Sequence, residues 1–305
     1  APPAQSTFDP PRQKLWLAAI KPPMYSVAIM PIMLGTAIAA ADGYPLHWDI
    51  FLIFFLAAIL ILAWENISND VFDSETGIDV NKAHSLVNLT QRKTLVFMIG
   101  NLCLALGITG ILTIALLQQD FTVLGLILLC CGLGYMYQGP PFRLGYQGLG
   151  EILCFFAFGP LGVSAAYYSQ TQTWSVASLL TSIILGLTTS LVLFCSHFHQ
   201  VEDDIAAGKT SPIVRLGTRR GAQLLPWICG ISLGIIGVLV LTGFAPPLTA
   251  IAIFSAIPAI RLCRHVWQYH AQPDRVSNCK FLAIHFHFWS GVLLSVGFWL
   301  GARIS

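Results

Sequence analysis

The sequence predicts an all-α polytopic membrane protein, and three observations carry this prediction. Of the 305 residues, 55% are hydrophobic and only 10% are charged, whereas about one-quarter of a typical soluble domain is charged. The mean hydropathy is +0.72. The hydrophobic residues gather into about nine segments that approach the roughly 20 residues a helix needs to cross a bilayer. We therefore expect a bundle of about nine transmembrane helices with polar loops capping its cytoplasmic end.

Most of the chain is expected to form one transmembrane unit. Residues 1–20 are predicted to be a flexible lead, because the opening A-P-P-A-Q-S-T-F-D-P-P is a poor helix former. Residues 21–305 are predicted to be a single transmembrane domain. The predicted spans are residues 25–40, 48–64, 94–117, 121–137, 152–168, 176–196, 224–242, 247–262 and 281–302.

The basic residues support this helix count independently of hydropathy. When these spans alternate in direction, all but one of the 16 Lys and Arg residues fall on the side of the N-terminus, and only Arg303 falls on the other. Positive residues mark the cytoplasmic side of a membrane. The sequence has no dense basic run of the kind that binds nucleic acid. We therefore expect an integral, multi-pass membrane protein with a cytoplasmic N-terminus and no nucleic-acid partner.

A dense polar stretch follows the second span and reads N-I-S-N-D-V-F-D-S-E-T-G-I-D over residues 66–79. If the helix continues into it, Asn66, Asp70 and Asp73 lie at i, i+4 and i+7 on one face, and Asp79 follows a turn at Gly77. Negative charge near membrane depth and at a helix C-terminus is unfavourable without a cation. This arrangement favours Mg²⁺, which binds one or two carboxylates together with phosphate oxygens. The alternative is a solvated acidic loop beyond the helix end.

A second acidic cluster follows the sixth span in the same way. The acids at 202–204 are followed by Lys209 and Arg215, a combination of carboxylates for a metal and cations for an anion. The preceding S-H-F-H contains His199, but no cysteine stands nearby to complete a zinc site. Both clusters fall on the cytoplasmic side, so we expect them to form one metal site.

Three further connections contribute polar side chains to this end. A tight connection, Y-Q-G-P-P-F-R-L-G-Y-Q-G-L-G-E, joins the fourth and fifth spans and brings Tyr137, Arg143 and Tyr146 to the mouth. For the tyrosines the alternative is an interfacial aromatic belt. Lys21 precedes the first span, either as a membrane anchor or as a substrate-facing cation. His84 lies in the polar connection between the second and third spans.

These motifs resemble those of the UbiA-type intramembrane prenyltransferases. The pattern N-D-x-x-D with a further aspartate, formed by Asn69, Asp70, Asp73 and Asp79, resembles the family's first acidic motif. The second cluster, followed by G-K-T-S-P-I-V-R-L-G-T, resembles the second. The connection after the fourth span is similar to that of the branch that prenylates 1,4-dihydroxy-2-naphthoate. The stretches N-K-A-H-S-L-V-N-L-T and H-F-H-Q-V-E-D-D-I-A-A-G-K are similar to the phytyl-transferring form of cyanobacteria and chloroplasts.

The resemblance implies a Mg²⁺-dependent transfer of the phytyl group from phytyl diphosphate to 1,4-dihydroxy-2-naphthoate or 2-carboxy-1,4-naphthoquinone. The reaction would release carbon dioxide and diphosphate and would be a step of phylloquinone biosynthesis. It would take place in a cyanobacterial cell or thylakoid membrane, or in a chloroplast membrane. Membrane lipid would surround the prenyl tail. The resemblance also implies roles for individual residues. Asn66, Asp70, Asp73, Asp203 and Asp204 would hold the metal; Asn69, Asp79, Lys82, Gln200, Lys209 and Arg215 would bind the diphosphate; Tyr137, Arg143 and Tyr146 would orient the acceptor as catalytic residues; Lys21, His84 and His199 would contact substrate elsewhere.

One departure from the family pattern leaves the ligands of the second cluster open. The family's second motif is D-x-x-x-D, and Asp204 occupies its second aspartate, but Gln200 stands at the first position. Either Gln200 supplies a neutral oxygen, or Glu202 or Asp203 replaces it from a different turn. Gln200 precedes Asp204 by one helical turn, which favours the first interpretation.

Two other kinds of function stay open on the sequence alone. The donor could carry a longer polyprenyl chain, as for menaquinone, or the acceptor could be another aromatic compound. An ion-coupled transporter also places acids in a membrane. A transporter predicts acids spread across the depth of the bilayer, whereas most acids here cluster near one face. The oligomeric state is not encoded in any of these motifs.

Overall fold

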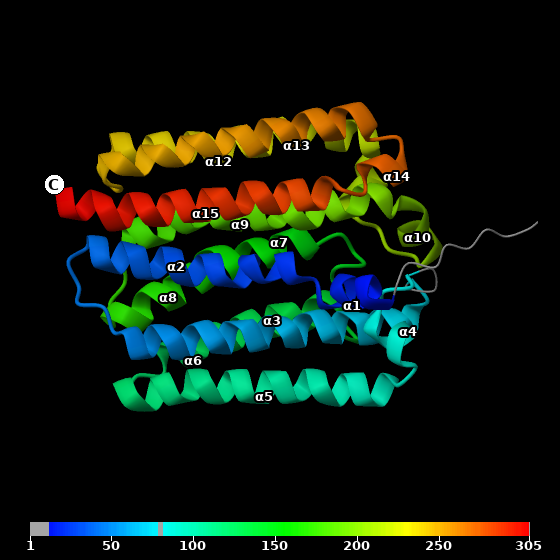
Figure 1. The fold of residues 1–305 in the computed structure, drawn as a ribbon, viewed down its shortest axis with the longest axis horizontal. Coiled ribbons are helices and arrows are strands. Elements are labelled where there is room, and N and C mark those ends of the chain that lie inside the picture. Colours follow the sequence, from blue (N-terminus) through cyan, green and yellow to red (C-terminus); the bar gives the residue numbers. More distant parts are fainter. Residues whose placement is uncertain (1–11, 79–81, 305) are drawn as a thin grey trace, which may run out of the picture.

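The computed structural model describes residues 12–78 and 82–304, and every regular element in these ranges is helical. The helices lie side by side in a bundle whose long axis is horizontal in Figure 1. Within these ranges, eight helical stretches are long and apolar enough to cross a membrane. The shorter apolar helix α6 (Thr122–Gln138) spans about 25 Å at 1.5 Å per residue. Together they confirm the predicted polytopic bundle of about nine spans.

Most spans are single helices, and two are composite. The spans are α2 (Tyr25–Ala41), α3 (Trp48–Thr76), α5 (Lys93–Gln118), α6, the unit of α7 (Gly150–Phe156), η2 (Ala157–Leu161) and α8 (Gly162–Thr171), α9 (Val176–Ser196), α12 (Thr218–Leu241), the unit of η4 (Pro247–Ser255) and α13 (Ala256–Tyr269), and α15 (Cys279–Ile304). The short elements are α1 (Arg12–Ile20), η1 (Pro22–Met24), α4 (Leu86–Thr90), η3 (His197–His199), α10 (Val201–Ala206), α11 (Pro212–Leu216) and α14 (Pro273–Val276).

The helix that carries the first acidic motif is held by close packing. α3 packs along α5, and the glycines of α5 allow this approach. A Cβ atom added at Gly107 would lie 2.7 Å from Cγ1 of Ile61 and 3.0 Å from the carbonyl oxygen of Ala57. Small residues let helices approach closely inside a membrane, where van der Waals packing drives association. On the other side of the bundle, α15 packs against α2, α9 and η4.

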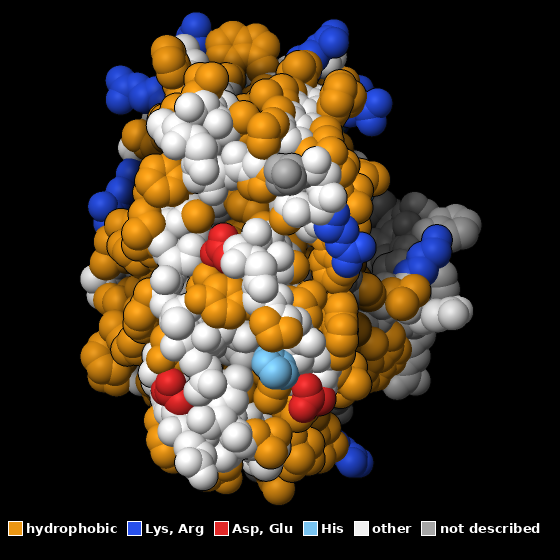
Figure 2. All heavy atoms as spheres, turned by 90° about the vertical axis from the view of Figure 1, so that its left-hand side faces the viewer, with side chains coloured by type: hydrophobic (Ala, Val, Ile, Leu, Met, Phe, Trp, Pro, Cys, Tyr) orange, Lys and Arg blue, Asp and Glu red, His pale blue; other side chains and the backbone are white. Residues whose placement is uncertain are grey.

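The two ends of the bundle differ in chemical character. The capping elements α1, α4, α10 and α14 all lie at one end, on the right in Figure 1, and the C-terminus lies at the other. Figure 2 looks onto the C-terminal end, where most of the Lys and Arg side chains in view lie towards the rim and the flanks are hydrophobic. The capped end therefore corresponds to the predicted cytoplasmic face with its polar loops.

A short helix lies within the last part of the predicted lead of residues 1–20. α1 occupies Arg12–Ile20, where R-Q-K-L-W-L-A-A-I consists mostly of good helix formers that follow two prolines. Residues 1–11 lie outside the described part of the chain. Lys21 separates α1 from the first span in a left-handed conformation with a φ of 53°, which ends α1 just before Pro22.

Candidate active site

The first acidic motif lies on the last turns of α3. The helix runs to Thr76, as predicted, and ends at Gly77, whose φ of 78° is a conformation that glycine adopts without strain. Asn66, Asp70 and Asp73 therefore share one face. Asp70 is 0% exposed and Asp73 is 8% exposed, so the carboxylates point into the protein rather than into a solvated loop.

Asp70 is the most heavily compensated carboxylate of the motif. Its Oδ1 lies 3.3 Å from Nζ of Lys21 and 3.2 Å from Nζ of Lys82, and its Oδ2 accepts a hydrogen bond of 3.0 Å from the backbone N–H of Leu86. Lys21 and Lys82 come from opposite sides of α3 in the sequence. A buried carboxylate needs such partners, because transfer of an unpaired charge out of water is costly. Two ammonium groups thus gather positive charge directly beside Asp70.

Asp73 is held by hydrogen bonds from neutral groups. Its Oδ1 accepts from Nε2 of Gln138 at 2.9 Å and from the hydroxyl of Tyr146 at 3.0 Å. The Tyr146 hydroxyl also lies 2.6 Å from Oγ1 of Thr76. Burial raises the pKa of Tyr146, and the neighbouring Asp73 carboxylate raises it further, so the phenol keeps its proton and acts as a donor. These contacts fix the connection after α6 above the end of α3.

The outer face of α3 carries a separate, more exposed ion-pair group. Glu75 lies 2.9 Å from Nζ of Lys93 and 3.0 Å from Nη2 of Arg143. Nη1 of Arg143 donates to the carbonyl oxygen of Phe72 at 3.4 Å, and its guanidinium carbon lies 5.9 Å from the centre of the Tyr146 ring. Arg143 therefore lies at the mouth, as predicted, but its partner is Glu75 rather than a carboxylate of the inner face.

The second acidic motif is built around Asp204, which is 0% exposed on α10. Its Oδ2 lies 3.2 Å from Nδ1 of His197, and its Oδ1 lies 3.8 Å from Nζ of Lys209. Burial alone would raise the pKa of Asp204, but the His197 hydrogen bond and the Lys209 charge outweigh it and lower this pKa below its usual value. The group therefore stays ionised at neutral pH.

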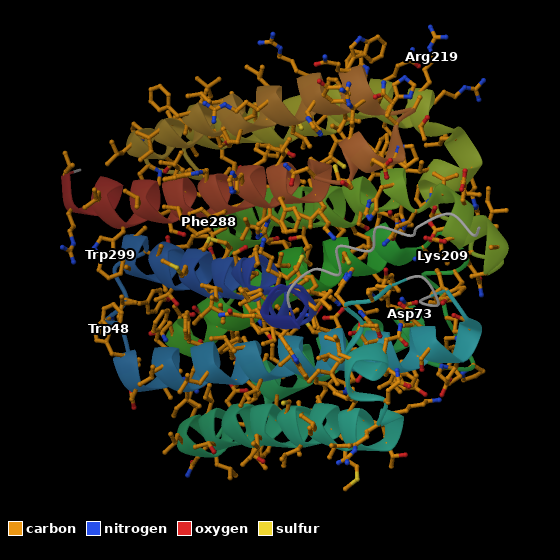
Figure 3. The ribbon with its side chains drawn as sticks, turned by 45° about the vertical axis from the view of Figure 1, so that its right-hand side comes forward. Trp48, Asp73, Lys209, Arg219, Phe288 and Trp299 are labelled. Atoms are coloured by element: carbon orange, nitrogen blue, oxygen red, sulfur yellow. The ribbon has the colours of Figure 1, made fainter. Side chains whose placement is uncertain are left out.

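The two motifs meet at one mouth. Figure 3 shows Asp73 and Lys209 at the same end of the bundle, far from Trp48 and Trp299. Nζ of Lys209 lies 5.6 Å from the centre of the Tyr146 ring, whose hydroxyl binds Asp73. The backbone N–H of Thr210 donates to the carbonyl oxygen of Tyr146 at 2.8 Å. Tyr146 thus connects the α3 half of the site with the α10 half.

Several predicted residues of the first motif lie beside these groups. Lys82 binds Asp70, and His84 follows it in the same connection. Burial and the charge of Lys82 lower the pKa of His84 to about 4, so this histidine is neutral at physiological pH. Nδ2 of Asn66 is buried and has no hydrogen-bond partner among the described residues, and Asn69 is partly buried on α3. Asp79 falls outside the described residues, so its predicted role is not placed.

The second motif has an interrupted backbone that the spacing alone did not reveal. α9 ends at Ser196, and Gln200 stands between η3 and α10. The backbone N–H of Asp204 donates to the carbonyl oxygen of Gln200 at 2.8 Å, so these two residues are one turn apart, as expected. Asp203 is half-buried and Glu202 is exposed, which sets Asp204 apart from its neighbours. Nδ1 of His199 is buried, and no hydrogen-bond partner for it lies in the part of the chain that the structure describes.

Arg215 has contacts that its predicted role did not include. Its Nη2 donates to the carbonyl oxygen of Gln147 at 2.6 Å, and its Nε donates to the carbonyl oxygen of Thr210 at 3.2 Å. The side chain is exposed, and its hydrogen bonds join the loop after α6 to the loop before α11. These contacts make Arg215 a structural link between the two halves of the mouth, while its predicted binding of diphosphate stays a prediction.

The structure adds Gln138 and Lys280, which sequence reasoning did not select. Gln138 binds Asp73. The Glu151 carboxylate, which the sequence places in the connection at the mouth, lies 3.5 Å from Nε2 of His197, on the side of the ring away from Asp204. Lys280, at the start of α15, lies close enough to Lys21 to feel its charge. Only their positions in the sequence could have indicated these residues, because each one falls in a connection predicted for the cytoplasmic end.

An apolar cavity lies below the mouth, between α2, α3, α6 and the α7–η2 region. On α3 its lining runs from Phe54 to Glu65, a length of about 16 Å along the helix. Tyr137 and Glu65 mark the end nearest the mouth, and Ile111 and Ile127 contribute hydrocarbon walls. A polar mouth that opens onto a hydrocarbon cavity matches an amphiphile with an anionic head and an apolar tail.

The carboxylates of the two motifs fit a divalent cation that takes part of its ligands from the substrate. Across the described ranges, no three Asp, Glu, His or Cys side chains converge into a ready-made metal centre. Among the described residues, no group donates a hydrogen bond to the buried Oδ1 of Asp204, and Nζ of Lys209 lies 3.8 Å from it. Mg²⁺ commonly takes one or two protein carboxylates and completes its shell with substrate phosphates and water. Asp70 and Asp73 on one side and Asp204 on the other fit this mode of binding.

The fold and the site define an intramembrane helical protein in which a polar mouth opens onto an apolar cavity. The model of the UbiA prenyltransferase family matches residues 28–292, and this chain therefore belongs to that family.

Three curated relatives are similar over nearly the whole chain. The 2-carboxy-1,4-naphthoquinone phytyltransferase of Synechocystis sp. is 54% identical over 301 residues, which cover 98% of each chain. The chloroplastic enzyme of the same name from Arabidopsis thaliana is 39% identical over 94% of this chain and 77% of its own length. The 1,4-dihydroxy-2-naphthoate octaprenyltransferase of Bacillus subtilis is 24% identical over 93% of this chain and 92% of its own.

Solved structures share the fold at low sequence identity. The apo structure of a UbiA homologue from Aeropyrum pernix has a TM-score of 0.67 at 15% identity, covering 91% of this chain and 98% of its own. A UbiA homologue from Archaeoglobus fulgidus, bound to DMAPP and Mg²⁺, has a TM-score of 0.59 at 13% identity, covering 92% and 99%. These matches confirm the predicted all-α membrane architecture.

Proposed function

We propose that this protein transfers the phytyl group of phytyl diphosphate to 1,4-dihydroxy-2-naphthoate or 2-carboxy-1,4-naphthoquinone, in a Mg²⁺-dependent step of phylloquinone biosynthesis. The observation that carries the proposal is the 54% identity to the Synechocystis phytyltransferase across 98% of both chains. The octaprenyltransferases that use 1,4-dihydroxy-2-naphthoate are 24–27% identical, so transfer of a longer chain is the second candidate. The proposed membrane is that of a cyanobacterial cell, a thylakoid or a chloroplast.

The lysines at the mouth support binding of a diphosphate. Lys21, Lys82 and Lys209 each lie beside a buried carboxylate, within 3.2 to 3.8 Å. Ammonium groups bind phosphate oxygens strongly through charge-assisted hydrogen bonds. When the donor binds, these groups would turn from the carboxylates to the diphosphate, and the carboxylates would then become available to a metal. Mg²⁺, when bound, supplies the charge that stabilises the departing diphosphate.

The chain's own groups also favour departure of the diphosphate. The allylic C–O bond breaks, its electron pair leaves with the diphosphate, and a ring carbon of the acceptor forms the new C–C bond as CO₂ is lost. Cations positioned before the reaction stabilise charge as it develops. The lower cavity walls around Phe54, Ile111 and Ile127 would hold the apolar tail of the donor, and these side chains offer water no hydrogen bond. Tyr146 and Arg143 would orient the acceptor at the mouth, with Tyr137 below them.

The test is an assay of the purified protein with 1,4-dihydroxy-2-naphthoate and a panel of prenyl diphosphates. We expect phytyl diphosphate to give the highest kcat/KM and the activity to disappear when EDTA removes divalent cations. A higher kcat/KM for octaprenyl diphosphate would favour the second candidate. No product with any donor would contradict the proposal.

A further inference from the structure

The cavity below the mouth contains a carboxyl group to which the proposed function assigns no role. Glu65 lies on α3 one to two turns before Asp70, about 7.5 Å along the helix axis. Its side chain lines the cavity together with Tyr137 and three cysteines of α6 and α7, and the rest of the lining is apolar. A carboxyl group inside a membrane span is expensive and marks a functional position.

The Glu65 carboxyl has unused capacity to accept hydrogen bonds. Across residues 12–78 and 82–304, no group donates a hydrogen bond to it. Lys21 is the cation whose charge acts on it, but Nζ of Lys21 is held by Asp70 at 3.3 Å. On the side of α6, a Cβ atom added at Gly134 would lie 3.6 Å from Cδ of Glu65 and 3.8 Å from its Oε1. The glycine thus gives the carboxyl room beside a surface that offers no donor.

The two substrates differ in what they could offer this group. An isoprenoid tail is hydrocarbon, and packing it against Glu65 would leave the carboxyl without any partner. A dihydroxylated aromatic acid has a flat apolar body for the cavity walls and O–H groups that can donate to a carboxyl oxygen. The described residues that line the lower part of the cavity, around Phe54, Ile111 and Ile127, are apolar and suit the tail.

We infer that Glu65 positions the aromatic acceptor by accepting a hydrogen bond from one of its ring hydroxyl groups at the upper end of the cavity. This inference rests on the proposed function, because it identifies the residue that selects a hydroxylated ring at the same site. Tyr137 lines the same end of the cavity and can bind the second ring oxygen. The ring then lies directly below Asp70 and Asp73, where the allylic carbon of the donor becomes reactive.

The test compares acceptor binding, which does not depend on turnover. Calorimetry would give the Kd of 1,4-dihydroxy-2-naphthoate and of the analogues 1-hydroxy-2-naphthoate and 4-hydroxy-2-naphthoate, each lacking one hydroxyl group. Wild type should bind the dihydroxy acid more tightly than at least one analogue. Glu65→Leu should weaken the dihydroxy acid by about threefold to tenfold, the range for losing a hydrogen bond between uncharged groups, and should leave that analogue's Kd nearly unchanged.

Matched variants separate recognition from packing. Glu65→Gln keeps the size of the side chain and a neutral hydrogen-bond acceptor, so its loss of affinity for the dihydroxy acid should be intermediate. This variant also allows the test if Glu65→Leu fails to fold. Cys131→Ala alters the lining of the same cavity on α6 and should leave the ratio of the Kd values as in wild type. Equal weakening of all three acids by both Glu65 variants would show a structural role and overturn the inference.

The outcome is distinguishable from failure of the proposed function. If wild type neither binds nor converts 1,4-dihydroxy-2-naphthoate, the proposed function fails. If wild type converts it with phytyl diphosphate but the Glu65 variants keep the wild-type ratio of Kd values, the inference alone fails. A change in the KM for phytyl diphosphate as large as the change in acceptor Kd would place Glu65 beside the donor instead, which also overturns the inference.

Discussion

Replacing Asp70 by asparagine removes one negative charge and leaves the size of the side chain unchanged. Lys21 and Lys82, at 3.3 and 3.2 Å, would then face a neutral amide. Loss of one partner from a fully buried ion pair costs about 3–5 kcal/mol, whereas exposed pairs contribute about 0–1 kcal/mol. Asp70 is buried, but the lysine side chains are 24% and 20% exposed, so solvent screens part of the effect. We expect a loss of about 2 kcal/mol in the free energy of unfolding, which leaves the protein folded.

The effect on catalysis should be much larger. Removal of one group that stabilises developing charge lowers kcat by about 10²- to 10³-fold in enzymes of known mechanism. Asp70→Asn weakens metal binding and also loosens the two lysines, so we expect a loss of at least this size. The Mg²⁺ concentration at half-maximal activity should also rise, because an amide attracts the ion less than a carboxylate does.

The matched control is Glu75→Gln on the other face of the same helix. Glu75 is 34% exposed and pairs with Lys93 and Arg143, contacts of the kind that contribute about 0–1 kcal/mol. The kcat/KM of Glu75→Gln should therefore fall by less than about fivefold. Both variants would be assayed for diphosphate release after their helix content is checked by circular dichroism. Equal sensitivity of the two variants would refute the assignment of roles to the two faces of α3.

Three further predictions concern Gln200, His84 and the topology of the bundle. If Gln200 is a metal ligand or binds beside one, Gln200→Asp should lower the Mg²⁺ concentration needed for half-maximal activity. An unchanged Mg²⁺ dependence of Gln200→Asp, together with inactivity of Asp203→Asn, would instead make Asp203 the ligand. Burial lowers the pKa of His84 to about 4 in the folded state, so the unfolded chain binds more protons between pH 4 and 6.5 and stability falls as pH drops through this range. The melting temperature of His84→Gln should therefore fall less than that of wild type between pH 7 and 5. Equal falls would contradict the burial of a neutral histidine. In a cysteine-free background, a cysteine at Thr210 should label from the cytoplasmic side and one at Gly43 from the other; labelling of both from one side would contradict the topology.

The α3 half of the site could be predicted from the sequence because its geometry is local. Once a helix continues past residue 64, positions 66, 70 and 73 must share a face, and Gly77 supplies the conformation that ends it. The identity of the partners was not local. The pairing of Lys21 with Asp70 bridges 49 positions, and that of Gln138 with Asp73 bridges 65, so only the packed bundle determines them.

The α10 half was predicted less completely, since its helix is interrupted. Helical spacing assumes a continuous helix through residues 196–206, whereas η3 breaks it and turns His197 towards Asp204 at 3.2 Å. The bonds from Arg215 to two backbone carbonyl oxygens likewise depend on which loops meet at the mouth. Charge alone predicted an anion-binding role for Arg215, because a sequence shows the sign of a side chain but not the groups that surround it.

The most direct test of the central claim is a stoichiometric assay in liposomes containing the purified protein, phytyl diphosphate, carboxyl-labelled 1,4-dihydroxy-2-naphthoate and Mg²⁺. We predict equimolar release of diphosphate and labelled CO₂ with formation of one phytylated naphthoquinol, and no release of either when one substrate or the metal is omitted. Release of diphosphate without CO₂ and without a phytylated product would contradict the account, as would ion flux across the liposomes in place of product formation.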